Sequence, residues 1–215
     1  MTYRELVYMC LDEIKLSSDD SYITEDHILY LISKYRAFLL RQKYEKTNMP
    51  VNKENFQYLR NVSEGDLIPT IMAISIPKID FQIKNLPYEG IFIPYERFKY
   101  VGNNKYLTND KSKIVYVTAD RLNNIRITPV HDDITLIPIY AVFEDILSAS
   151  MYEFPDTDIL DCRCPIEAEL VAGVQEMVVK DALGVAYRPN DFINNGADDL
   201  SKLGMAAASN SKKKE

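Results

Sequence analysis

The sequence predicts an α+β protein, in which a helical bundle carries an inserted antiparallel β domain and ends in an extended arm. Near both ends of the chain, apolar side chains recur every three or four residues, which is typical of amphipathic helices. The middle is rich in Ile, Val, Tyr, Phe and Thr, in short runs broken by Pro, Gly and Asn, which is typical of strands. The predicted units are a helical hairpin over 1–48, a mainly-β domain over 49–150, a linker and bundle helix over 151–189, and an arm over 190–215.

The hairpin is expected to consist of helices over 2–16 and 24–46. Thr2 and Glu5 have the spacing of a capping box, in which each side chain bonds the backbone amide of the other residue. Thr24 is a suitable N-cap for the second helix, and acidic residues follow it in the first turn, where the helix dipole favours negative charge.

A stripe of positive charge lies on the second helix, opposite its apolar face. Its members are Lys34, Arg36, Arg41 and Lys43. Two interpretations remain open: an ordinary solvated helix face, or a docking face for an acidic partner.

The β domain is predicted to contain short strands, because six prolines lie in or beside its apolar runs and proline cannot donate to a strand ladder. The expected strands are 67–76, 91–93, 97–101, 113–118, 124–128 and 134–142. Residues 52–61 before them fit a short helix. The third bundle helix is predicted over 165–187, with Pro165 at its first position and Pro189 beyond its end.

Composition excludes several function classes. The net charge is −7, with 25 basic and 32 acidic residues, which argues against a chain that coats nucleic acid. Residues 151–215 carry 7 basic and 12 acidic side chains and therefore −5 of that charge. A region of this charge gains nothing from counterion release on nucleic acid. No signal peptide or membrane-spanning run is expected.

No catalytic set, cofactor site or metal site is predicted. Cys162 and Cys164 have no matching second pair, so structural cysteines or free thiols are expected rather than zinc ligands, and with Cys10 the odd count fits a reducing compartment. His131-Asp132-Asp133 is read as a polar turn. The acidic loop over 156–161 lacks the Gly and Glu of a calcium loop. We therefore predict a protein that is not an enzyme.

Four stretches of the chain resemble a known family: MTYREL at 1–6, FKYVGNNK at 98–105, YAVFED at 140–145 and ALGVAYRPNDFINNGADDL at 182–200. Together with the order of hairpin, β insertion, late helix and arm, they resemble the head–tail connector or adaptor (ring) proteins of short-tailed phages, most of all those of crAss-like phages. The resemblance extends over nearly the whole chain and lies in packing and turn motifs.

The resemblance implies a structural virion protein, made in the host cytoplasm, that forms a dodecameric ring below the portal at the head–tail interface. Its implied partners are the portal, other tail ring proteins and further copies of itself, while DNA passes through without specific binding and no membrane is involved. The implied portal-contact residues of the arm are Asn190, Phe192, Ile193, Leu200, Leu203, Lys212, Lys213 and Lys214. The implied bundle and ring-packing residues are Leu31, Tyr35, Phe38, Leu170, Val174 and Met177. The alternative function is a small α+β regulatory or binding module that forms no ring.

Overall fold

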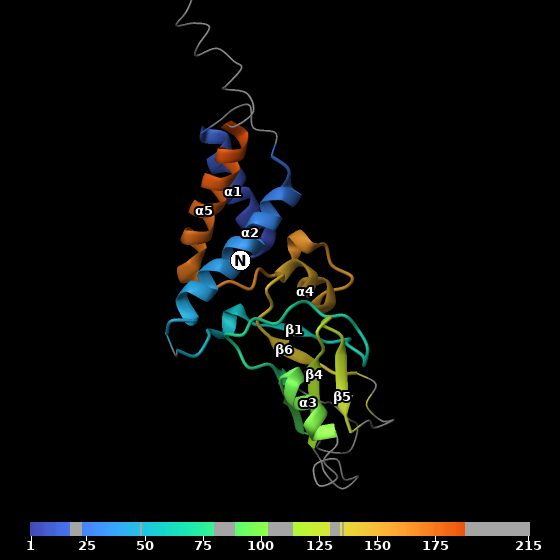
Figure 1. Cartoon of the computed structure of the whole chain (residues 1–215). Helices are drawn as coiled ribbons and strands as arrows, with labels where there is room; N and C mark the ends of the chain where they lie inside the picture. Colours follow the sequence, from blue (N-terminus) through green and yellow to red (C-terminus); the bar gives the residue numbers. More distant parts are fainter. Residues whose placement is uncertain are drawn as a thin grey trace, which may run out of the picture.

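A computed structural model describes residues 1–17, 23–47, 49–79, 89–102, 114–129, 134 and 136–187 of the chain. These residues form a helical bundle at one end of the molecule and a sheet with a covering helix at the other, with a short helix between them (Figure 1). The predicted α+β class is confirmed. The predicted arm and the turn at His131-Asp132-Asp133 lie outside the described residues.

Three helices pack together as the bundle: α1 over Tyr3–Ser17, α2 over Glu25–Tyr44 and α5 over Ala168–Tyr187. Each helix turns an apolar stripe inward, and the three stripes enclose one core. Its buried members include Leu6, Val7, Cys10, Ile14, Ile28, Leu31, Ile32, Val174, Val178 and Ala182. The bounds of α1 and α2 lie within two residues of the predicted bounds.

Both predicted N-caps are present. The Thr2 amide donates to the Glu5 carboxylate (2.9 Å) and the Glu5 amide donates to Thr2 Oγ1 (3.3 Å), so the capping box is closed. At the start of α2, the His27 amide donates to Thr24 Oγ1 (3.3 Å). Local sequence signals thus define where both helices begin.

The third bundle helix begins later than predicted, at Ala168 rather than Pro165. The Pro165 carbonyl accepts a hydrogen bond from Arg36 Nε (2.7 Å) and so does not serve as the first helical acceptor. Glu167 is buried and takes part in tertiary contacts instead of lying on a solvated first turn. Before this stretch, a 3-10 turn, η2, covers Ile159–Asp161.

The sheet has six strands in the order β1-β6-β2-β3-β4-β5. Their bounds are β1 Gln57–Leu59, β2 Lys78–Ile79, β3 Glu89–Phe92, β4 Ile114–Ala119, β5 Ile125–Thr128 and β6 Ile139–Ala141. Neighbouring strands are antiparallel except β3 and β4, which run parallel with Gly90 opposite Val115. The sheet is therefore mixed rather than purely antiparallel as predicted.

The parallel pair is connected by a helix, in a stretch where a strand was predicted. Residues 97–101 belong to α3, which covers Tyr95–Gly102 and lies between β3 and β4 in the chain. Parallel neighbours need such a crossover connection. The Pro94 carbonyl accepts from the amides of Arg97 and Phe98 and so starts the first turn. The α3 helix packs against β4 and β5, while Tyr100 on it remains 79% exposed.

Two predicted strands are shorter or absent. Residues 67–76 form only isolated bridges at Leu67 and Ile71, and Pro69 between them has no amide to donate. The predicted strand over 134–142 is limited to β6. The sheet is accordingly built from pieces of two to six residues.

Residues 52–61 and 146–153 also differ from the prediction. The expected helix over 52–61 is only the 3-10 turn η1 at Lys53–Asn55, capped by Asn52, and the chain then enters β1. The short helix α4 covers Ile146–Glu153 and packs on β1. Asp145 caps α4 by accepting from two of its first amides. The α4 helix thereby lies between the sheet and the bundle.

Arg36 of α2 joins these parts from inside the protein. Its side chain is fully buried, and its three kinds of nitrogen donate to the carbonyls of Asn55 (2.8 Å), Phe143 (2.9 Å) and Pro165 (2.7 Å). Burial lowers its pKa to about 10, which still leaves the guanidinium charged at neutral pH. One side chain therefore links α2 to η1 before the first strand, to the segment after β6 and to the segment before α5.

Candidate functional site

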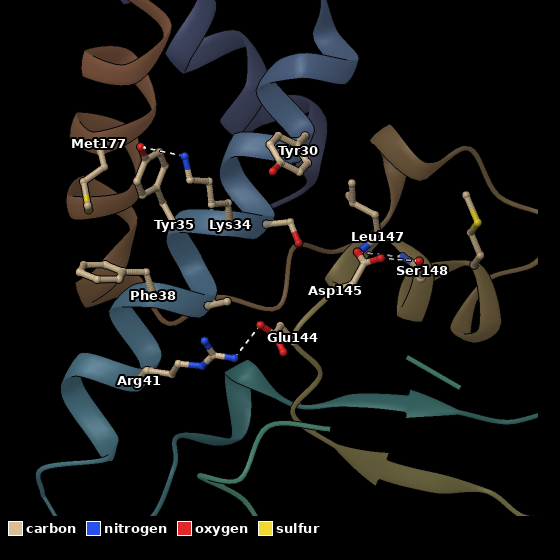
Figure 2. Close-up of a pocket in the computed structure, with 13 residues that line it drawn as sticks. Tyr30, Lys34, Tyr35, Phe38, Arg41, Glu144, Asp145, Leu147, Ser148 and Met177 are labelled. Carbon is tan, nitrogen blue, oxygen red and sulfur yellow. Dashed lines mark hydrogen bonds and ion pairs between the residues drawn. The ribbon is translucent and has the colours of Figure 1, made fainter. Parts of the chain in front are cut away.

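An open groove of about 740 Å³ lies between α2 and α4. Figure 2 shows α2 along its middle, α4 on one side and α5 on the other, with α1 behind α2. Side chains from three helices and from the turn before α4 line it, namely Tyr30, Ser33, Lys34, Tyr35, Ala37, Phe38, Arg41, Glu144, Asp145, Leu147, Ser148, Met151 and Met177. Its position depends on α4, which brings a segment from more than 100 residues further along the chain beside α2.

Large apolar side chains in this groove are open to solvent. Tyr30 is 61% exposed, Phe38 52% and Met151 61%. Single exposed apolar residues are common on protein surfaces, but several that share one hollow often mark an interaction site. Aromatic residues and methionine are also enriched at the centres of protein interfaces.

One rim of the groove carries a small polar network. Asp181 accepts from the Tyr35 hydroxyl (2.7 Å) and forms an ion pair with Lys34 Nζ (3.0 Å). The hydrogen bond from Tyr35, followed by that from Lys34, lowers the pKa of Asp181, whereas partial burial raises the pKa of Tyr35. Lys34 Nζ also donates to the Tyr35 hydroxyl (3.4 Å), so these contacts fix the side chains of α2 against α5 and use two of the three Lys34 N–H donors.

The second rim joins α2 to the turn before α4. Arg41 forms an ion pair with Glu144 (2.6 Å), and the next residue, Asp145, accepts from the Ser148 hydroxyl and caps α4. Ser148 is thus committed to a helix cap and is not paired with a base. The groove offers shape, apolar surface and two cations, and its residues do not form a nucleophile–base arrangement.

The two interpretations left open by the sequence did not include the role that the structure shows for the positive stripe on α2. Each of its exposed members forms ion pairs within the chain. The N–O distances are Lys34–Asp181 3.0 Å, Arg41–Glu144 2.6 Å, Lys43–Glu167 3.1 Å and Lys43–Glu169 2.8 Å. The fourth member, Arg36, is buried. These ion pairs hold α2 against α5, against the residue before α5 and against the turn before α4.

Comparison with known proteins identifies the family. A family model described as phage tail ring protein 2 matches residues 5–200. The protein "Ring protein 2" of Bacteroides phage crAss001 is 35% identical over 235 aligned residues, which cover 93% of this chain and 98% of that relative. The chain belongs to the phage tail ring protein 2 family. The resemblance inferred from the sequence motifs is thereby confirmed.

A phage tail ring protein is a structural component of the virion. In the ranges that the structure describes, no three His, Cys, Asp or Glu side chains are grouped as metal ligands would be. None of the described helices is long and apolar enough to cross a membrane. For a tail ring protein, a groove of this kind is a candidate subunit-contact surface.

The six residues expected to pack in the bundle or ring occupy two different places. Leu31 and Val174 are buried in the bundle core, and Leu170 is half-buried between that core and the base of α2. Tyr35, Phe38 and Met177 line the groove, where Figure 2 shows them on the side toward α5. The eight arm residues predicted to contact the portal lie outside the described residues.

The cysteines and His27 are held inside the protein. Cys10, Cys162 and Cys164 are buried free thiols, and burial raises the pKa of Cys10 and Cys164 to about 12, which suits structural residues. His27 is half-buried and its Nε2 is enclosed.

Sequence reasoning missed Tyr30 and Met151 as groove residues. Tyr30 could have been found, because it lies on α2 at helical spacing from Lys34 and Phe38, on the face opposite the core stripe. Met151 gave no such signal, since α4 itself was not predicted.

Proposed function

We propose that this tail ring protein forms a dodecameric ring below the portal, where it joins head to tail and surrounds the DNA passage. The observation that carries the proposal is the 35% identity to a phage ring protein over 93% of this chain. A match of that extent favours a ring subunit over a small α+β regulatory module. A ring in this position would lie at the head–tail interface of the virion.

The groove supports assembly into a ring. A closed ring of identical subunits is built from head-to-tail contacts, so each copy must present two different surfaces. The groove leaves Tyr30, Phe38 and Met151 exposed within one copy. Burial of such side chains on assembly would contribute to holding neighbouring subunits together.

The long axis of the molecule supports an orientation within the tail. The last turns of α5 lie at the end of the bundle that is far from the sheet (Figure 1). Residues 190–215, which follow α5, would then extend from the bundle end toward the portal. The sheet would face the next tail ring protein.

The charge distribution bears on the DNA passage. Most acidic side chains between 151 and 187 form ion pairs within the chain, namely Asp158 and Asp161 with Arg4, Glu167 and Glu169 with Lys43, Glu176 with Lys180, and Asp181 with Lys34. Most of the acidic charge in this stretch is thus balanced by cations of the same chain. The same pairs neutralise cations that would otherwise bind phosphate, so DNA would pass without specific binding.

Removal of residues 190–215 tests the proposed portal contact. We expect the chain 1–189 to keep the helical content of the bundle, because α5, the last of the three bundle helices, ends at Tyr187. We also expect it to lose co-purification with portal rings. Binding is measured by pull-down on purified portal, and folding by circular dichroism.

The matched control is the full chain with Lys212, Lys213 and Lys214 replaced by Gln. If those lysines alone made the contact, this variant would also lose co-purification with portal rings. Undiminished assembly of the 1–189 chain on portal rings would show that the arm does not bind the portal.

A further inference from the structure

The outer face of α1 is a second surface with exposed apolar side chains. The helix turns its core residues toward α2 and α5, and on its opposite face Tyr8 and Met9 are each 43% exposed. Acidic residues flank this pair, with Glu5 one turn before it and Asp12 one turn after it, and both are exposed. Seen into the groove, α1 lies behind α2 (Figure 1, Figure 2). The two surfaces therefore lie on opposite sides of the bundle.

The two surfaces match in spacing and in charge. On α2, Lys34 and Arg41 are seven residues apart with Phe38 between them, and on α1, Glu5 and Asp12 are seven residues apart with Tyr8 and Met9 between them. At a rise of about 1.5 Å per residue, each charge pair spans about 10 Å along its helix. Two helices packed side by side would bring carboxylates to cations at both ends of one apolar contact.

The cations of the groove can accept this second partner. Lys34 and Arg41 keep nearly half of their side-chain surface exposed although each already has one ion pair. An ammonium has three N–H donors and a guanidinium five, so one carboxylate does not saturate either group. Exclusion of water by the apolar side chains between them would strengthen both contacts.

We propose that α1 of one copy docks into the α2–α4 groove of the next copy, and that repetition of this contact closes the ring. The occupant of the groove is thus a second copy of this chain, which deepens the proposed ring function and rests on it. Because the two surfaces differ and lie on opposite sides of the bundle, the contact is head-to-tail, as a ring requires.

Cross-linking in assembled virions tests this contact. Virions are prepared in which the chain carries both Met9→Cys and Phe38→Cys, and are treated with a short bismaleimide. We expect a ladder of multimers on a denaturing gel and loss of the monomer band, because each copy is then cross-linked to a neighbour through each of its two introduced cysteines. Both substituted side chains are exposed and the native cysteines are buried, so labelling is directed to the new positions.

The single variants Met9→Cys and Phe38→Cys are the matched controls and should stay monomeric. Dimers formed by Met9→Cys alone would indicate a two-fold contact between α1 helices and would overturn the proposal. So would a double variant that is present in virions and gives no more multimers than the single variants. Absence of the unmodified chain from virions would instead contradict the proposed function itself.

A second measurement identifies the occupant directly. A benzophenone attached at Phe38→Cys is photolysed in virions, and the linked peptide is found by mass spectrometry. We expect peptides from residues 5–16 of another copy. Capture of residues 190–215 or of a different virion protein would overturn the proposal. So would the absence of any linked product at Phe38→Cys when the same label at Tyr100→Cys, on α3, shows that the labelled chain is assembled into virions.

Discussion

Replacement of Arg36 by Met is expected to lower the free energy of unfolding by at least about 3 kcal/mol. The substitution removes the donors to three buried carbonyls, those of Asn55, Phe143 and Pro165, and an orphaned buried acceptor costs about 1–3 kcal/mol. Methionine keeps most of the volume, so the loss reports the hydrogen bonds rather than a cavity. Urea unfolding measures it, and the melting temperature should fall by about 6 °C or more.

The matched control is Arg41→Met on the same helix. Arg41 is half-exposed and has one ion pair, and such surface pairs contribute about 0–1 kcal/mol. Equal losses for the two variants would show that Arg36 does not hold the bundle to the sheet.

Replacement of Tyr3 by Ala is expected to cost about 3–5 kcal/mol, which is the range for removal of a buried aromatic side chain. Tyr3 is fully buried at the start of α1, and its hydroxyl lies 3.1 Å from Ser150 Oγ and 3.3 Å from the Ile146 carbonyl, both on α4. Gln57 Nε2 of β1 donates to the same two groups. The variant therefore opens a cavity where α1, α4 and the sheet meet.

Two further variants separate packing from hydrogen bonding. Tyr3→Phe keeps the ring and should cost only about 1 kcal/mol. Tyr8→Ala, at an exposed position of the same helix, should change the stability of the single copy by no more than about 0.5 kcal/mol. A Tyr3→Ala variant as stable as Tyr8→Ala would contradict the burial of Tyr3. Chemical denaturation of dilute protein provides all three values.

The sequence predicted best what is decided locally. The capping box at Thr2 and Glu5 and the N-cap at Thr24 depend on residues within one turn, and the apolar stripes of α1, α2 and α5 follow from helical periodicity. The sequence misled where tertiary contacts override local preference. The aromatic and β-branched residues of α3 favour a strand, yet the chain needs a crossover there because β3 and β4 are parallel.

The groove could not be predicted for a related reason. One wall is α2, whose exposed Tyr30 and Phe38 are visible in the helical pattern, and the other is α4, a short helix with a weak pattern. The burial of Arg36 depends on carbonyls that come from three distant segments, and a sequence shows only a basic residue on a polar helix face. Such features arise when separate elements meet, and no local pattern encodes them.

The mass of the complex between this chain and the portal tests the central proposal most directly. Purified portal rings are mixed with the full chain and the complex is weighed by native mass spectrometry. Ring assembly predicts a single species, in which the chain forms a dodecamer on the portal ring. The two proteins are then present in equal numbers. A complex with only a few copies bound at random, or no complex with the portal at all, would contradict it.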